Sequence, residues 1–161
     1  MKNNPEIKTN VMRVLGARGI HYAHFSYDPD KYNSGAEIAA ALSQNPAAVF
    51  KTLVTIARPG KYYVFMVPVC CELDLKRASA AVGEKSLAML PQRELLGLTG
   101  YIHGGCSPIG MKKQFPTVID ASAQNFDTII FSAGARGHQV ELTVADLQKI
   151  IKITFADICA Q

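Results

Sequence analysis

Lys51 is the residue whose type and position most clearly suggest chemistry. It stands inside an otherwise apolar segment, residues 49–54 (VFKTLV), whose composition is typical of a β-strand. An ammonium group is costly to bury without a partner, so such a lysine either reaches water along its alkyl stem or serves as a fixed cation. A fixed cation can hold a phosphate or a carbonyl oxygen. Strand alternation predicts that Lys51 lies with Leu53 on the face opposite Thr52.

Two glycine-rich segments could place backbone groups against a ligand. Residues 104–110 (GGCSPIG) contain three glycines and a proline, and residues 131–137 (FSAGARG) contain two glycines. Glycine permits unusual backbone angles and close approach, so the first segment could aim N–H and C=O groups at a carbonyl or an amine. In the second segment, Ser132 or Arg136 could contact a ribose or a phosphate. Tight connecting turns would produce the same patterns, and both interpretations stay open.

A catalytic cysteine is an alternative chemistry. Cys106 lies within the first glycine-rich segment, with His103 three residues upstream as a candidate base. No third group that would orient the histidine is evident, which disfavours this alternative. The sequence contains no HExxH, P-loop, GxGxxG or GxSxG motif. His21 and His24 would face opposite ways in a strand, so we expect no metal and no other cofactor.

The composition is that of an ordinary globular chain. It has 161 residues, 48% hydrophobic and 19% charged, and this length fits a single domain over residues 1–161. The formal net charge of +4 permits a polyanionic partner without requiring one. The four cysteines show no CxxC spacing, and neither a signal segment nor a membrane-spanning apolar run is evident. We therefore expect reduced thiols, a cytoplasmic location and no membrane contact.

Helices and strands are interspersed along the chain without regular βαβ units. The patterns predict a first helix opened by Asn4–Pro5–Glu6 and closed by Gly19. Further helices are expected over residues 35–42, 74–82 and 91–96, and from Thr143 past Ile151. Strands are expected over residues 20–27, 49–57, 62–69, 86–90, 118–120, 128–132 and 139–142. Because hairpins dominate, the expected class is α+β (mixed α/β), with a curved, largely antiparallel mixed sheet flanked by helices.

These segments, taken in order, resemble the YbaK-type Cys-tRNA(Pro) deacylases, a family related to the editing domain of bacterial prolyl-tRNA synthetases. The similarity covers nearly the whole chain, and its most specific parts are the VFKTLV strand and the GGCSPIG loop that follows it. Other matching segments are residues 25–27 (FSY), 45–46 (NP), 73–76 (LDLK), 100–101 (GY), 116–120 (PTVID) and 155–158 (FADI). The resemblance implies the mixed sheet with flanking helices already expected.

The resemblance also implies roles for particular residues. Lys51 would occupy the essential lysine position of the family, and the Gly104 backbone would hold the aminoacyl group; these are the two expected catalytic residues. The expected substrate-binding residues are Tyr27, Ser34, Thr52, Gly105, Ser107, Pro108, Ser132 and Arg136. Ser34 stands where many members have an aromatic residue, Gln139 where an acidic one is common, and Cys106 replaces an aliphatic one. These departures bear on amino-acid specificity rather than on membership.

The activity implied is that of a trans-editing aminoacyl-tRNA deacylase, acting on the ester of a mischarged tRNA such as Cys-tRNA(Pro). Its expected partners are the acceptor end of aminoacyl-tRNA and prolyl-tRNA synthetase. With no Ser-His-Asp set in view, we expect catalysis by positioning and electrostatics, with attack by the substrate's own thiol or by water. The alternatives are a deacylase of another mischarged tRNA such as Ala-tRNA(Pro), a general ester or thioester hydrolase, and a noncatalytic module that binds tRNA or a synthetase.

Overall fold

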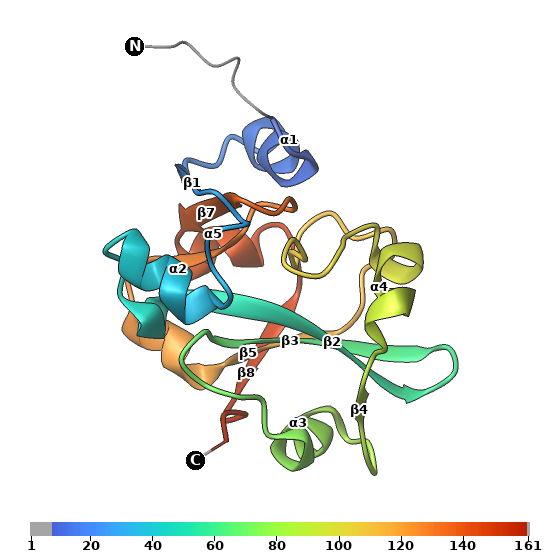
Figure 1. Ribbon diagram of the computed structural model, residues 1–161. Helices are drawn as coiled ribbons and strands as arrows, with labels where there is room; N and C mark the ends of the chain where they lie inside the picture. The colour runs from blue at the N-terminus through green and yellow to red at the C-terminus, as the bar shows by residue number, and fades with distance from the viewer. Residues whose placement is uncertain (1–7, 161) are drawn as a thin grey trace, which may run out of the picture.

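The computed structural model describes residues 8–160 and shows five α-helices and eight strands in this range (Figure 1). The helices are α1 (Asn10–Ala17), α2 (Gly35–Ala41), α3 (Leu75–Val82), α4 (Gln92–Thr99) and α5 (Val144–Gln148), with short 3₁₀ turns at Pro46–Ala48 (η1) and Ala121–Asn125 (η2). None of the helices in this part of the chain is long and apolar enough to cross a bilayer.

The strands form two sheets. The larger has the order β4-β2-β3-β5-β8, in which β2 and β3 form an antiparallel hairpin and the β3–β5 and β5–β8 pairs are parallel. Its strands are β4 (Ala88–Met89), β2 (Phe50–Arg58), β3 (Lys61–Pro68), β5 (Thr117–Asp120) and β8 (Ile153–Ala156). The smaller sheet is antiparallel and has the order β1-β7-β6, from β1 (Ala23–Ser26), β7 (His138–Leu142) and β6 (Ile129–Ser132). A parallel bridge between Val49 and Ile130 joins the two sheets.

The mixed α/β class expected from the sequence is confirmed, with differences in detail. Four of the six strand pairings are antiparallel, but the strands are divided between two sheets rather than forming one. The final helix ends at Gln148, and the chain then enters β8, a strand that the pattern did not predict. Helix α4 is longer than expected and ends at Gly100. The predicted helix start at Asn4–Pro5–Glu6 lies outside the described residues, in which α1 begins at Asn10.

Helix boundaries follow from side chains that satisfy free backbone N–H groups. The Ser34 hydroxyl accepts from the N–H of Glu37 at the start of α2, and the Asp74 carboxylate accepts from the N–H groups of Lys76 and Arg77 at the start of α3. Gly83 ends α3 in the left-handed conformation that glycine adopts without strain (φ 72°).

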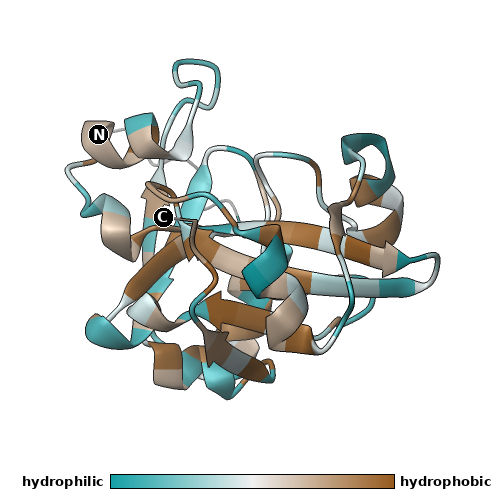
Figure 2. Cartoon of the chain, turned by 90° about the horizontal axis from the view of Figure 1, so that it is seen from below, coloured by the Kyte–Doolittle hydropathy of each residue, from teal (hydrophilic) through white to brown (hydrophobic). Residues whose placement is uncertain are grey.

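Strand β3 is buried on both faces, and hydrophobic residues colour long stretches of the strands in Figure 2. On one face Phe50 and Val54 pack in the cluster that contains α1 and the smaller sheet. On the other, Phe65 and Val67 pack with Ala78 of α3. Burial on two sides explains why β3 reads as a continuous apolar run. The start of β2 is thereby held rigidly between both layers.

Candidate active site

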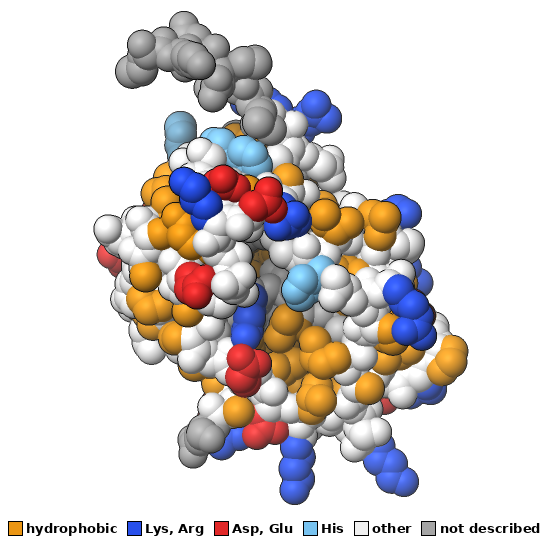
Figure 3. Space-filling view, viewed as in Figure 1, with side chains coloured by type: hydrophobic (Ala, Val, Ile, Leu, Met, Phe, Trp, Pro, Cys, Tyr) orange, Lys and Arg blue, Asp and Glu red, His pale blue; other side chains and the backbone are white. Residues whose placement is uncertain are grey.

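A cavity of about 260 Å³ opens where the start of β2 meets the loop at residues 103–106 and the smaller sheet. Its polar lining residues are Tyr27, Lys51, Thr52, His103, Ser132 and Gln139. Its other lining residues are Gly35, Ile38, Val49, Phe50, Leu53, Val69, Leu95, Gly104, Cys106 and Phe131. Figure 3 shows a hollow near the centre of this face, with basic, acidic and histidine side chains around it. The volume suits a small group rather than a whole nucleotide.

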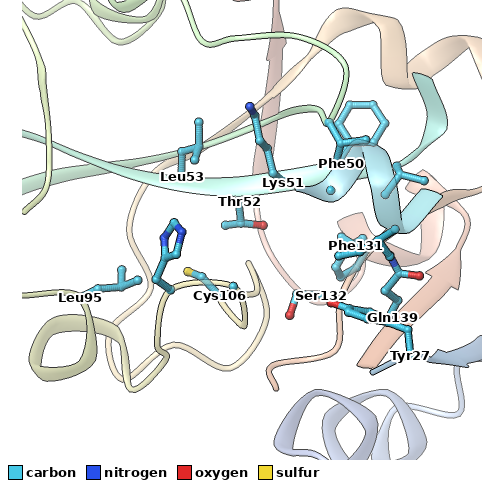
Figure 4. A pocket seen from close by; sticks show the side chains of 16 residues that line it. Tyr27, Phe50, Lys51, Thr52, Leu53, Leu95, Cys106, Phe131, Ser132 and Gln139 are labelled. Carbon is cyan, nitrogen blue, oxygen red and sulfur yellow. The ribbon is translucent and has the colours of Figure 1, made fainter. Parts of the chain in front are cut away.

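Lys51 is the only Lys, Arg, Asp or Glu among the described lining residues. Its ammonium donates to the carboxylate of Glu72, with 3.3 Å between Nζ and Oε1. The Lys51 side chain is 29% exposed, so its stem is largely covered while its charge stays in reach of solvent. In Figure 4 it leaves β2 in the direction opposite to Thr52, as alternation predicts. The ammonium is therefore held at the edge of the cavity and not at its floor.

Thr52 supplies an unsatisfied group to the cavity. Its side chain extends from β2 toward Cys106 and Ser132 (Figure 4). Thr52 Oγ1 is buried and has no hydrogen-bond partner among the described atoms. A buried hydroxyl without a partner costs free energy, which a ligand that bonds to it would return. Ser132 lies on the opposite wall, where its hydroxyl accepts from the N–H of Gly134 at 3.1 Å.

The glycine-rich loop contributes one glycine to the cavity and buries the next. Gly104 lines the cavity in a left-handed conformation (φ 87°) that favours glycine. Gly105 packs against the β6–β7 turn, where an added Cβ would lie 3.0 Å from the backbone nitrogen of Arg136. The close approach of two backbones, rather than contact with a ligand, therefore explains the second glycine.

Four further residues with an expected substrate role also lie outside the cavity lining: Ser34, Ser107, Pro108 and Arg136. Ser107 and Pro108 are buried within the loop, and Ser34 caps α2. Arg136 lies beside Gly104 and forms an ion pair with Asp30 (Nη2–Oδ1 3.4 Å). Of the expected site residues, the structure therefore brings five together in the cavity lining: Tyr27, Lys51, Thr52, Gly104 and Ser132. The other five do not line the cavity: Ser34, Gly105, Ser107, Pro108 and Arg136.

Cys106 and His103 line the same cavity, but the thiol is poorly suited to attack. Cys106 is only 8% exposed, and its burial raises the pKa of the thiol to about 12. The nucleophile is the thiolate, which is scarce at neutral pH with such a pKa. The geometry therefore favours a role for Cys106 in packing.

The end of the cavity near the smaller sheet is polar and uncharged. Gln139 is 6% exposed, and its Oε1 accepts from Gln44 Nε2 at 2.8 Å. Nearby, Gly35 at the start of α2 lies so close to Val69 that an added Cβ would be 2.7 Å from its Cγ1. A larger residue at position 35 would therefore displace this wall. No group of three His, Cys, Asp or Glu side chains within residues 8–160 could hold a metal ion.

Sequence reasoning did not identify the apolar lining. Phe50 and Leu53 could have been inferred as neighbours of Lys51 on the same strand. Leu95 of α4, Val69 and Phe131 come from distant segments, and no local signal marks them as lining residues.

Comparisons with known proteins agree with this architecture. Residues 28–150 match the model of the aminoacyl-tRNA editing domain family. A protein of Enterococcus faecalis, named "Putative Cys-tRNA(Pro)/Cys-tRNA(Cys) deacylase EbsC", is 40% identical over 158 residues, covering 98% of this chain and 96% of that protein.

Two solved structures share the fold. One is described as a "putative trans-editing enzyme for prolyl tRNA synthetase"; it has a TM-score of 0.82 and 24% identity, and the match covers 94% of this chain and 95% of the other. The hypothetical protein APE2540 has a TM-score of 0.83 and 22% identity, with 93% and 99% covered. The family match extends over most of the chain and includes every residue that lines the cavity except Tyr27. The chain belongs to the aminoacyl-tRNA editing domain family.

Proposed function

We propose that this protein is a trans-editing deacylase that removes a wrongly attached amino acid from tRNA, with Cys-tRNA(Pro) as its substrate. The name of the Enterococcus faecalis relative supports this choice of substrate. The observation that carries the proposal is the position of Lys51. It is the one charged side chain among the described residues of a small cavity, which it shares with the Gly104 backbone and the unpaired Thr52 hydroxyl.

The chemistry required is modest, because the ester between an aminoacyl carbonyl and a terminal ribose is already activated. Lys51 would hold the terminal phosphate or ester region at the edge of the cavity, and the Gly104 backbone would orient the amino acid. The Thr52 hydroxyl would bond to the aminoacyl or ribose group. The cavity of about 260 Å³ has room for the aminoacyl group of the substrate.

The attacking group depends on the substrate. In cysteinyl-tRNA the side-chain sulfur would attack the aminoacyl carbonyl and form a cyclic thioester. The ester C–O bond would break, and the proton lost by the thiol would pass to the ribose oxygen of the released tRNA. An alanyl group has no such sulfur, so a bound water would attack, giving alanine and tRNA. Ala-tRNA(Pro) is the second candidate substrate, because Gln139 at the end of the cavity near the smaller sheet is neutral and an alanyl group needs no charged partner there.

We also propose that residues 1–161 act as one editing domain in the cytoplasm, where charged tRNA is made, with prolyl-tRNA synthetase as a partner. The net charge of +4 is modest for a protein that binds nucleic acid, and a synthetase could supply further tRNA affinity.

The test is deacylation by the purified protein of tRNA(Pro) charged with cysteine, alanine or proline. The expected result is rapid release of cysteine, slower release of alanine and retention of proline. Faster release of alanine would make Ala-tRNA(Pro) the substrate. Failure to release any amino acid, with retained tRNA binding, would favour a noncatalytic module, and cleavage of simple thioesters alone would favour a general hydrolase.

A further inference from the structure

The carboxylate of Glu72, which is not a lining residue, forms an ion pair with the Lys51 ammonium at the edge of the cavity. Glu72 follows the turn after β3, and its side chain is 84% exposed, whereas that of Lys51 is 29% exposed. The pair is 3.3 Å apart. Glu72 is not among the residues that line the cavity, so it contacts the site only through Lys51.

The backbone that carries Glu72 is fixed on both sides. The N–H of Cys71 donates to the carbonyl of Pro68 at 2.9 Å, which closes the turn. The carbonyl of Glu72 accepts from the N–H of Ala160 at 2.7 Å, and Leu73 forms an antiparallel bridge with Cys159. These contacts hold the backbone of Glu72 in place, while its exposed side chain can move in solvent.

In an exposed ion pair, another anion can easily replace the carboxylate. Exposed pairs contribute about 0–1 kcal/mol, because both ions are well solvated when they separate. A phosphate of the tRNA end that approaches Lys51 would meet the negative charge of Glu72 within a few ångströms. Two anions at one ammonium repel each other, so a bound phosphate favours movement of the exposed carboxylate away from Lys51.

We infer that Glu72 is a positioning residue that holds the Lys51 ammonium at the edge of the cavity in the free enzyme and is displaced by the phosphate of the substrate. This inference rests on the proposed function. It means that the affinity of the free enzyme for RNA is reduced by its own carboxylate.

The first experiment measures KM and kcat for Cys-tRNA(Pro) with Glu72→Gln. Removal of the competing charge should lower KM about two- to five-fold and leave kcat unchanged. The matched control is Asp157→Asn, which removes the same charge from another exposed acid paired with a base, Arg77 (2.7 Å). The control should leave KM within error of wild type. An unchanged or raised KM in Glu72→Gln, or an equal decrease in the control, would overturn the inference.

The second experiment distinguishes displacement of Glu72 from Lys51 from a general repulsion between the Glu72 carboxylate and RNA. Binding of an uncharged RNA hairpin that ends in the tRNA acceptor sequence is measured for wild type, Glu72→Gln, Lys51→Ala and the double variant. Glu72→Gln should bind more tightly than wild type, and this gain should disappear in the Lys51→Ala background. A gain that persists without Lys51 would refute the inference. Binding does not require turnover, so this arm reports on Glu72 even if no charged tRNA is cleaved and the proposed function fails.

Discussion

The two ends of strand β2 each carry a basic residue paired with a carboxylate. The two pairs differ in the number of donors that hold the carboxylate and in its exposure. At the hairpin end, Arg58 donates to Glu84 at 3.1 Å, and the Tyr63 hydroxyl donates to the same carboxylate at 2.6 Å. At the other end, the only carboxylate within ion-pair distance of Lys51 among the described residues is Glu72.

Burial separates the two pairs further. The side chain of Glu84 is 13% exposed and that of Glu72 is 84% exposed. The Tyr63 hydrogen bond, helped by Arg58, holds the pKa of Glu84 below its ordinary value. Two donors hold the carboxylate of Glu84, whereas the carboxylate of Glu72 is held among the described residues by Lys51 alone. The first carboxylate is therefore fixed, and the second can leave its cation more easily.

Among the substitutions that test this comparison, Lys51→Ala should have the largest effect on activity. We expect deacylation of Cys-tRNA(Pro) to fall at least about 100-fold, because a preorganised charge at the ester is lost. The thermal unfolding midpoint should stay near that of wild type, because the exposed pair with Glu72 contributes little. Turnover assays and thermal unfolding on the same sample would check both expectations, and near wild-type turnover would remove Lys51 from the mechanism.

Thr52→Val tests the face of β2 opposite Lys51. The substitution keeps the shape and removes the hydroxyl whose oxygen is buried without a partner. We expect kcat/KM to fall about ten-fold through loss of one hydrogen bond to the substrate. The unfolding midpoint should not fall, because an unsatisfied polar group is removed. A loss of stability with unchanged kcat/KM would assign Thr52 to the fold instead.

Tyr63→Phe tests the structural end of the strand. Loss of the hydrogen bond to Glu84 should lower the free energy of unfolding and leave deacylation unchanged. Because the folded pKa of Glu84 is depressed, its contribution is present above the ordinary pKa of a glutamate and is lost as pH falls through the folded value. Denaturant unfolding should therefore show a difference between Tyr63→Phe and wild type at pH 7 that narrows as the pH falls below the ordinary pKa of a glutamate.

Among the substitutions of residues that line the cavity, Cys106→Ser should have the smallest effect on activity. With a thiol pKa of about 12, on the order of one molecule in 10⁵ carries the thiolate at neutral pH. We expect kcat/KM to change less than about two-fold, and the pH–rate profiles of variant and wild type to coincide. A large loss of activity in Cys106→Ser would make the thiol, rather than Lys51, the centre of the site.

Much of the fold could be predicted because its signals are local. The β-branched run at Val49–Ala57 and the Pro59–Gly60 turn indicate the β2–β3 hairpin, and capping residues such as Ser34 and Asp74 mark where helices begin. Strand β8 was missed because Ile150, Ile151 and Ile153 continue an apolar pattern that suits a helix as well as a strand. Its pairing with β5 is a contact between distant segments, which a local pattern does not contain.

The residues of the site likewise divide into those that local sequence indicates and those that it does not. Lys51 could be identified because an isolated charge in an apolar strand is unusual, and Gly104 because glycine clusters are. The resemblance assigned a substrate role to both Gly104 and Gly105, and only the fold shows that Gly105 packs against the backbone of Arg136. The apolar walls formed by Leu95 and Val69 depend on how separate elements pack, so local sequence did not reveal them.

The bridge between Val49 and Ile130 has a consequence for how the molecule acquires its activity. Contacts between residues far apart in the chain form slowly, because the intervening segment must first lose its freedom. The cavity wall includes both Val49 and Phe131, so it is complete only after the two sheets have docked. On dilution from denaturant, catalytic competence should therefore return in the last kinetic phase, after the hairpin and helices have formed.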